Sequence, residues 1–166
     1  WIGGEDLLLT WDGKHARDLR PHLKRDCGLV INHCWGMTQD NAGHIWIGAS
    51  HLLFFDGQHF CTYGPQDGLP EVALAHAVCR DPDGDIWVGG KDQIVRFNGQ
   101  SFQPILATAM GQVHRICCDN TDIMWVGSTG SGAYYSDGES FQHLSVAEGL
   151  PSLMVLDVLR DSEGLY

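Results

Sequence analysis

Apolar and polar positions alternate along short segments of this chain, and one apolar-rich tripeptide recurs at nearly constant intervals. A tryptophan, an aliphatic residue and a glycine stand together four times, beginning at Trp1, Trp46, Trp87 and Trp125. The intervals are 45, 41 and 38 residues. Short alternating segments favour β-strands, and a period near forty is typical of repeats that each form one small sheet. Such sheets bury their faces by packing around an axis, so we expect an all-β fold of β-propeller blades.

Each blade is expected to contain four antiparallel strands in a fixed order. The first strand is an apolar segment that ends at an acidic turn, as in 34–40, 75–81, 113–119 and 155–161. The second strand carries the signature tryptophan. The third strand is predicted at 7–11, 52–55, 94–97 and 133–136. An Asp-Gly or Asn-Gly pair follows each third strand, at residues 12, 56, 98 and 137, which is typical of a type I′ hairpin turn. Three of the fourth strands carry an aromatic residue, namely Phe60, Phe102 and Phe141.

The chain begins in a second strand and ends in a first strand. We expect a single domain, 1–166, with repeat units at about 1–45, 46–86, 87–124 and 125–166. Residues 153–161 could pair beside residues 1–4 and complete a blade from both chain ends. Three arrangements remain open, in decreasing order of preference: part of a larger ring, a half-ring that a homodimer completes, and a four-bladed ring.

Composition narrows the classes of partner. Asp and Glu outnumber Lys and Arg by 21 to 10, and the formal net charge is −11. Nucleic acids and anionic membranes are poor partners for such a chain, and no apolar run is long enough for a membrane span. Of the six cysteines, Cys79 and Cys117 occupy equivalent repeat positions. Equivalent points on packed sheets lie about 10 Å apart, beyond disulfide reach, so these two are expected to be small core residues.

The repeat resembles the two-component regulator propeller family. Residues 81–90, Asp-Pro-Asp-Gly-Asp-Ile-Trp-Val-Gly-Gly, and residues 67–70, Asp-Gly-Leu-Pro, carry this resemblance most closely. It implies a ligand-binding sensor module of bacterial signal transduction, often extracytoplasmic and periplasmic, in rings that usually have seven blades. No catalytic residue is carried over, because the shared positions are structural.

Candidate binding residues are the aromatic and polar side chains that do not recur in every repeat. The signature tryptophans at 46, 87 and 125 are expected to pack between blades. Trp35, His76, His114 and Leu156 each stand five residues before the turn aspartate, on the strand expected to line the central channel. His33, Arg115 and Asp157 flank that column, and Trp11, Tyr134 and Tyr135 are further aromatic candidates.

The preferred function is a non-catalytic recognition module that binds a small molecule, an oligosaccharide or a protein on its variable loops. Two alternatives stay open. One is an enzyme similar to streptogramin lyases, with His76, His114 or His143 as general base. The other is a scaffold for protein interaction or self-association. No cofactor is expected, because the Asp81 turn lacks the EF-hand spacing and no cysteine or histidine pair has the spacing of a zinc site.

Overall fold

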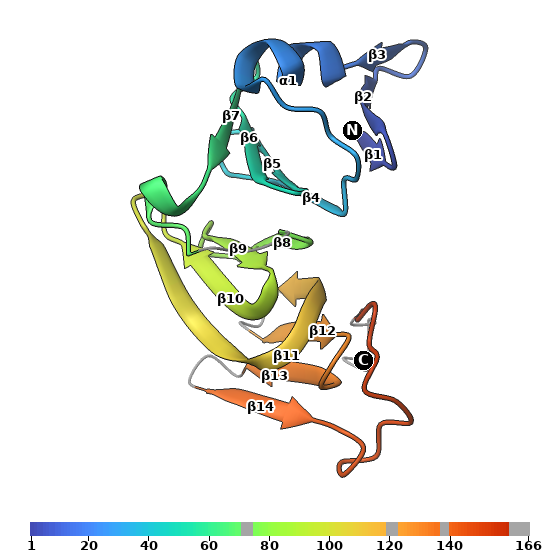
Figure 1. Cartoon of the computed structure of the whole chain (residues 1–166), viewed down its shortest axis with the longest axis vertical. Helices are drawn as coiled ribbons and strands as arrows, with labels where there is room; N and C mark the ends of the chain where they lie inside the picture. Colours follow the sequence, from blue (N-terminus) through green and yellow to red (C-terminus); the bar gives the residue numbers. More distant parts are fainter. Residues whose placement is uncertain (71–74, 119–122, 137–139, 160–166) are drawn as a thin grey trace.

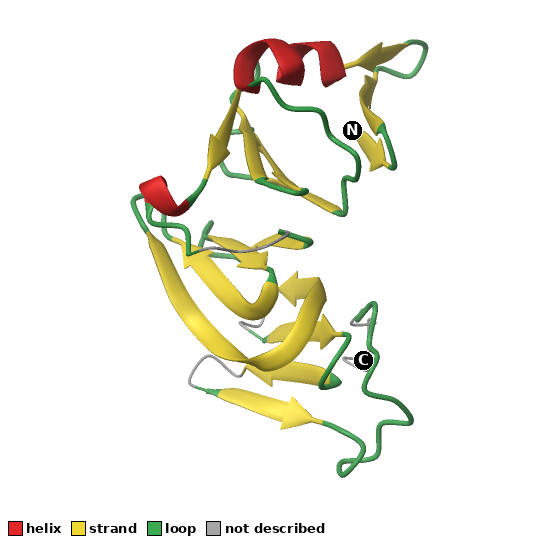
Figure 2. Cartoon of the chain, in the orientation of Figure 1, coloured by secondary structure: helices red, strands yellow, loops and turns green. Residues whose placement is uncertain are grey.

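The computed structural model is built almost wholly from antiparallel strands and describes residues 1–70, 75–118, 123–136 and 140–159. The strands fall into four consecutive units, which follow one another along the chain in Figures 1 and 2. The first unit contains β1 (Ile2–Gly4), β2 (Leu7–Trp11) and β3 (Ala16–Asp18). The second contains β4 (Gly36–Gln39), β5 (Ile45–Gly48), β6 (Leu52–Phe55) and β7 (Phe60–Tyr63).

The third and fourth units share one long strand. The third contains β8 (Ala77–Arg80), β9 (Ile86–Gly89), β10 (Lys91–Phe97) and the first part of β11 (Phe102–Cys118). The fourth contains the last part of β11, β12 (Met124–Ser128), β13 (Ala133–Ser136) and β14 (Phe141–Leu144). No Gly-Leu-Pro connection separates these units, so the outer strand of one continues directly into the first strand of the next and joins both into a seven-stranded sheet.

The register confirms the predicted third strands. Trp46 lies opposite Phe54, and Trp125 lies opposite Tyr135, so the signature strand pairs with the predicted third strand in both units. The prediction of an all-β fold of antiparallel sheets is therefore confirmed.

The predicted type I′ hairpin turn is wrong. Gly13, Gly57 and Gly99 have φ values of 97°, 102° and 85°, but the residues that follow them do not have positive φ. A type I′ turn needs positive φ at both central residues, whereas a type II′ turn needs it only at the first. The preceding Asp or Asn stabilises this geometry: in the first turn, Oδ1 of Asp12 accepts the backbone N–H groups of Lys14 and His15. The fourth predicted turn, at 137–138, lies outside the described residues.

Helix α1 (Arg20–Cys27) was not anticipated. Pro21 stands in its first turn and Gly28 ends it in the left-handed conformation, with φ of 69°. Both are ordinary helix boundary signals. Leu23 of α1 packs with Leu8 of the first unit and Phe60 of the second, so the helix covers the junction between these two units. Between the second and third units, the chain forms only the short helix η1 (Pro65–Asp67) within residues 65–70.

Neighbouring units pack closely against the signature glycine. A Cβ atom at Gly89 would lie 2.3 Å from Cγ1 of Val113 in the next unit, and one at Gly48 would lie 2.5 Å from the carbonyl oxygen of Ala75. A Cβ atom at Gly3 would likewise crowd Cys34, and one at Gly127 would crowd Val155. The four contacted residues hold equivalent positions in the repeat, where the chain enters each following unit. The glycine therefore recurs because only a hydrogen atom fits between the units.

The signature indoles occupy the junctions between units. Trp46 and Trp87 are only 2 % and 8 % exposed, and their apolar neighbours come from both adjoining units. Trp125 departs from the expectation of a buried core residue, because it is half-buried and stacks on Tyr135. Trp1 is 39 % exposed.

The array is open rather than closed through its two chain ends. The backbone N–H of Val155 donates to the carbonyl oxygen of Ser128 at 2.8 Å, and the N–H of Gly132 donates to the carbonyl oxygen of Leu153. Residues 153–155 therefore lie beside β12, whereas β1 lies in the opposite half of Figure 1. The predicted pairing of 153–161 with residues 1–4 is wrong for its described part, and residues 160–161 lie outside the described range. The compact four-bladed ring is excluded with it.

Candidate functional site

Three of the predicted site residues come together where the first strands of the second, third and fourth units begin or run side by side. The backbone N–H of Trp35 donates to the carbonyl oxygen of Gly48, and the N–H of His76 donates in the same way to Gly89, at 2.9 and 3.0 Å. These equivalent hydrogen bonds place both residues directly before the first strands of their units, β4 and β8. His114 holds the corresponding position in the fourth unit, at a register irregularity between Val113 and Arg115.

The rings of these residues form a continuous row across three units. His33 stacks on Trp35 with ring centres 5.4 Å apart and planes only 5° from parallel. The Trp35 ring lies 3.8 Å from that of His76, and His76 meets the edge of His114 at 5.2 Å. We call His33, Trp35, His76 and His114 the aromatic row. It runs along the edge of the array where successive first strands lie side by side.

His76 is the buried centre of the aromatic row. Its side chain is 8 % exposed, and among the residues that the structure describes neither Nδ1 nor Nε2 has a hydrogen-bond partner. Burial, with the neighbouring histidines 114 and 33, lowers the pKa of His76 from 6.5 to about 4. The imidazole is therefore neutral at physiological pH and offers one N–H donor and one acceptor nitrogen. Two unsatisfied buried polar atoms are costly, so such a ring is a natural place for a ligand hydroxyl or a water.

The ends of the aromatic row are open to solvent. Trp35 is 37 % exposed, His33 is exposed and His114 is half-buried. Arg115 stands beside His114 and forms an ion pair with Asp157, with Nε and Oδ1 3.2 Å apart. Both side chains of this pair are largely exposed, so the pair contributes little to stability.

The two candidate tyrosines lie elsewhere. Tyr134 is 7 % exposed, packs in the core between the third and fourth units, and stacks on His143 with ring centres 4.6 Å apart. Tyr135 stacks on Trp125. Both tyrosines are on β13, two strands away from the first strand that carries His114. The structure therefore groups Trp35, His76 and His114, with Arg115 adjacent, and separates them from Tyr134 and Tyr135.

The three histidines considered as a general base do not converge. His76 and His114 are neighbours in the aromatic row, but His143 is on β14, where its Nε2 lies 2.6 Å from the carbonyl oxygen of Ser131. Among the described residues, no group of three or more histidine, cysteine, aspartate or glutamate side chains is arranged to hold a metal ion. The described helices include none long and apolar enough to cross a membrane.

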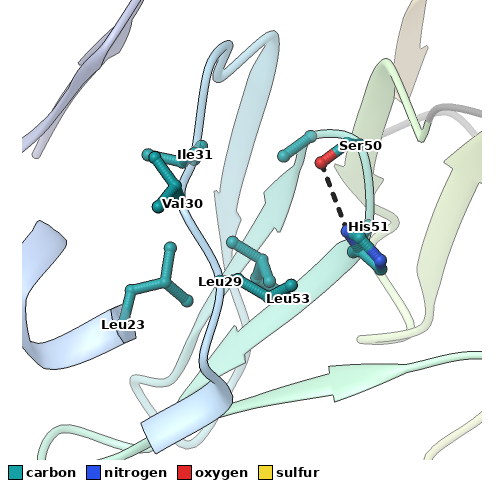
Figure 3. A pocket seen from close by; sticks show the side chains of 8 residues that line it. Leu23, Leu29, Val30, Ile31, Ser50, His51 and Leu53 are labelled. Carbon is teal, nitrogen blue, oxygen red and sulfur yellow. Dashed lines mark hydrogen bonds between the residues drawn. The ribbon is translucent and has the colours of Figure 1, made fainter. Parts of the chain in front are cut away.

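An apolar hollow lies beside α1 and was not predicted from the sequence, because the helix itself was not predicted. Figure 3 shows Leu23 of the helix, Val30 and Ile31 of the following loop, and Leu53 of β6 around this space, with Ser50 and His51 at its side. It encloses about 10 Å³, room for no more than one water molecule. Ligand pockets for small molecules usually exceed about 300 Å³, so this hollow is a packing defect rather than a binding site.

Comparison with known proteins places the chain among propellers. Residues 68–92 match the family described as two component regulator propeller, which confirms the resemblance predicted from residues 67–70 and 81–90. No curated protein shows significant sequence similarity to the chain.

Solved structures share the fold at low sequence identity. One is the extracellular domain of the hybrid two component system BT4673 from B. thetaiotaomicron, with TM-score 0.78 and 15 % identity, covering 99 % of this chain and 24 % of that one. A second structure of the BT4673 extracellular domain gives TM-score 0.76, 16 % identity and the same coverage. PorZ, a surface component of the type-IX secretion system of Porphyromonas gingivalis, gives TM-score 0.63 and 14 % identity over 87 % of this chain and 24 % of its own. The chain spans about a quarter of the length of each.

Proposed function

We infer that this chain, which carries a two component regulator propeller repeat, is a non-catalytic segment of a bacterial sensor propeller and binds a small, uncharged polar ligand along its aromatic row. The single observation that carries this proposal is the His76 side chain, which is buried and has no hydrogen-bond partner on either ring nitrogen among the described residues.

The chemistry of the aromatic row suits a polyhydroxylated ligand such as an oligosaccharide. A neutral imidazole provides a donor and an acceptor for hydroxyl groups, as His76 does at physiological pH. The adjacent indole of Trp35 offers a partly exposed aromatic face for the apolar side of a sugar ring. The net charge of −11 disfavours anionic ligands.

Longer proteins of the same fold support a setting for this segment. The matched structures are about four times as long as this chain, and the BT4673 structures are extracellular domains. We place the chain as part of a larger propeller ring outside the cytoplasm, where ligand occupancy would reach a signalling partner through neighbouring units. The described array does not close on itself (Figure 1), which supports a larger ring over a compact four-unit ring.

Thermal-shift measurements against a panel of neutral oligosaccharides test the proposal. A ligand at about one hundred times its Kd raises the Tm by about 5–10 °C. The rise should be lost in Trp35→Ala and His114→Ala. The matched control is Trp11→Ala, because Trp11 is also exposed but lies on β2 of the first unit.

Two results would overturn this assignment. Equal loss of the shift in Trp35→Ala and Trp11→Ala would move the site away from the aromatic row. No shift with any small molecule, together with tight binding of a protein partner by the same chain, would make the array an interaction scaffold.

A further inference from the structure

Two cysteines face each other across the junction of the third and fourth units. Cys79 of β8 lies opposite Trp87, and directly opposed residues of an antiparallel pair share one face of the sheet. Trp87 packs against the fourth unit, so Cys79 points to the fourth unit as well. Cys118 of β11 follows Cys117, which lies opposite Trp125. Cys118 itself lies opposite Met124, which packs in the same cluster as Trp87 of the third unit, so Cys118 points back to the third unit.

The two thiols meet in the same apolar core. Cys79 and Cys118 both pack against the cluster that contains Trp87, Ile116 and Met124. Their side chains form a hydrogen bond to each other, which lowers the pKa of the Cys79 thiol. The same hydrogen bond and burial raise the pKa of the Cys118 thiol. Cys79 is therefore the better nucleophile of the pair, because the thiolate is the reactive form.

We propose that Cys79 and Cys118 are a redox pair that forms a disulfide between the third and fourth units. Cys79 does not face its repeat equivalent, Cys117, because equivalent residues point in the same direction. Cys118 is the next residue after Cys117 on β11, so its thiol lies on the opposite face of the strand and points towards Cys79. Disulfides persist in oxidising compartments, so the bond would form in an extracytoplasmic setting.

The reaction balances with a low-molecular-weight disulfide as oxidant. The Cys79 thiolate attacks one sulfur of the oxidant, forms a mixed disulfide and releases one small thiolate. Cys118 then gives up its proton and attacks Sγ of Cys79, which expels the second small thiol. The two cysteines lose two electrons and two protons in total, and the oxidant becomes two thiols.

The disulfide would link β8, which begins directly after His76 of the aromatic row, to β11, which carries His114. Cys79 follows His76 by three residues, and Cys118 follows His114 by four. A covalent link between β8 and β11 would therefore fix the contact between these two imidazoles. The inference itself rests on the cysteine geometry and does not depend on the proposed ligand.

Oxidation of the folded chain with oxidised glutathione tests the pair. We expect the intact mass to fall by two hydrogen atoms, and peptide mapping without reductant to recover a linked Cys79–Cys118 peptide. The Tm should rise by about 10 °C and return on reduction, because the bond closes a long loop. A linkage through Cys117, or glutathione adducts without any intramolecular bond in the folded chain, would overturn the proposal.

Matched serine variants distinguish a bond between Cys79 and Cys118 from one that involves the neighbouring Cys117. Cys117→Ser should still form the bond and show the full rise in Tm. Cys118→Ser should keep a glutathione adduct on Cys79 and show no rise. Circular dichroism before oxidation establishes that each variant is folded, and the peptide map of the parent chain decides the matter independently of the variants.

Discussion

The indole Nε1 of Trp87 donates a 2.8 Å hydrogen bond to Oδ2 of Asp81, six residues earlier. The other carboxylate oxygen, Oδ1, accepts the backbone N–H of Asp85 and so holds the turn before the signature strand. Trp46 and Asp40 repeat the arrangement at 3.1 Å. One aspartate thus fixes the turn and orients the indole that fills the junction between units. The equivalent Asp119 lies outside the described residues.

Removing this acceptor should destabilise the fold. Asp81→Ala leaves the buried indole N–H of Trp87 without its partner, and we expect a loss of about 2–3 kcal/mol in the free energy of unfolding. Asp81→Asn retains an acceptor oxygen and should lose less than about 1 kcal/mol. Urea denaturation measures both. Asp83→Ala, at an exposed position of the same turn, is the control and should stay within about 0.5 kcal/mol. Equal effects at 81 and 83 would contradict this role.

The signature glycine should not accept a methyl group. Gly89→Ala would place Cβ against Val113, and we expect a loss of about 2–3 kcal/mol from overpacking. Gly4→Ala is the matched control, because a Cβ there would lie 3.9 Å from its nearest neighbours, and Ser128 shows that a larger residue fits the equivalent position.

A double-mutant cycle attributes the effect to the contact itself. Adding Val113→Ala makes room for the new methyl group, so the combined loss should be smaller than the sum of the single losses by about 1 kcal/mol or more. Strict additivity would show that Gly89 is required for a reason other than its contact with Val113.

The repeat could be predicted from sequence because its signals are local and recur. The signature tripeptide marks the second strands, the Asp-Gly or Asn-Gly pairs mark the hairpins, and an acidic turn precedes each of the three internal signature tryptophans. The turn class was missed because Asp12 occupies the residue before the two central positions, which moves Gly13 to the first of them. Helix α1 was missed because it occurs once, and repeat alignment gives no weight to a segment without counterparts.

Less of the candidate site followed from sequence. Equivalent repeat positions placed Trp35, His76 and His114 in one column, and the structure brings their rings into contact. Sequence could not show that Tyr134 is buried in the core between units, because the face on which a strand residue lies relative to the next unit depends on packing. The Cys79–Cys118 contact was hidden for the same reason.

The buried imidazole should make stability depend on pH between about 4 and 6.5. In the folded chain His76 binds a proton only near pH 4, whereas an unfolded histidine does so near its ordinary pKa of 6.5. The unfolded state therefore binds more protons in this window, and stability is complete above it and declines as the pH falls through it. His76→Phe keeps a ring in the stack and should flatten this slope. An NMR titration that places the pKa of His76 near 6.5 would contradict the burial argument.

Stability should also depend on pH in a second, more acidic range, because of a carboxylate near the end of α1. The Arg25 side chain and the backbone N–H of Phe60 both donate to Asp26 and lower its pKa from 3.8 to about 2. Because the folded-state pKa is depressed, this stabilisation is present above pH 3.8 and is lost as the pH falls towards 2. Asp26→Asn should reduce the slope of acid unfolding in that range. Unfolding curves that coincide for the variant and the parent chain would refute the role of Asp26.

The most direct test of the central claim is an NMR titration of the histidine side chains with the oligosaccharide that gives the largest thermal shift. We predict saturable changes in the imidazole resonances of His76 and His114, with one common Kd, while those of His143 on β14 stay unchanged. Changes confined to His143, or binding that leaves His76 and His114 unaffected, would contradict a ligand site on the aromatic row.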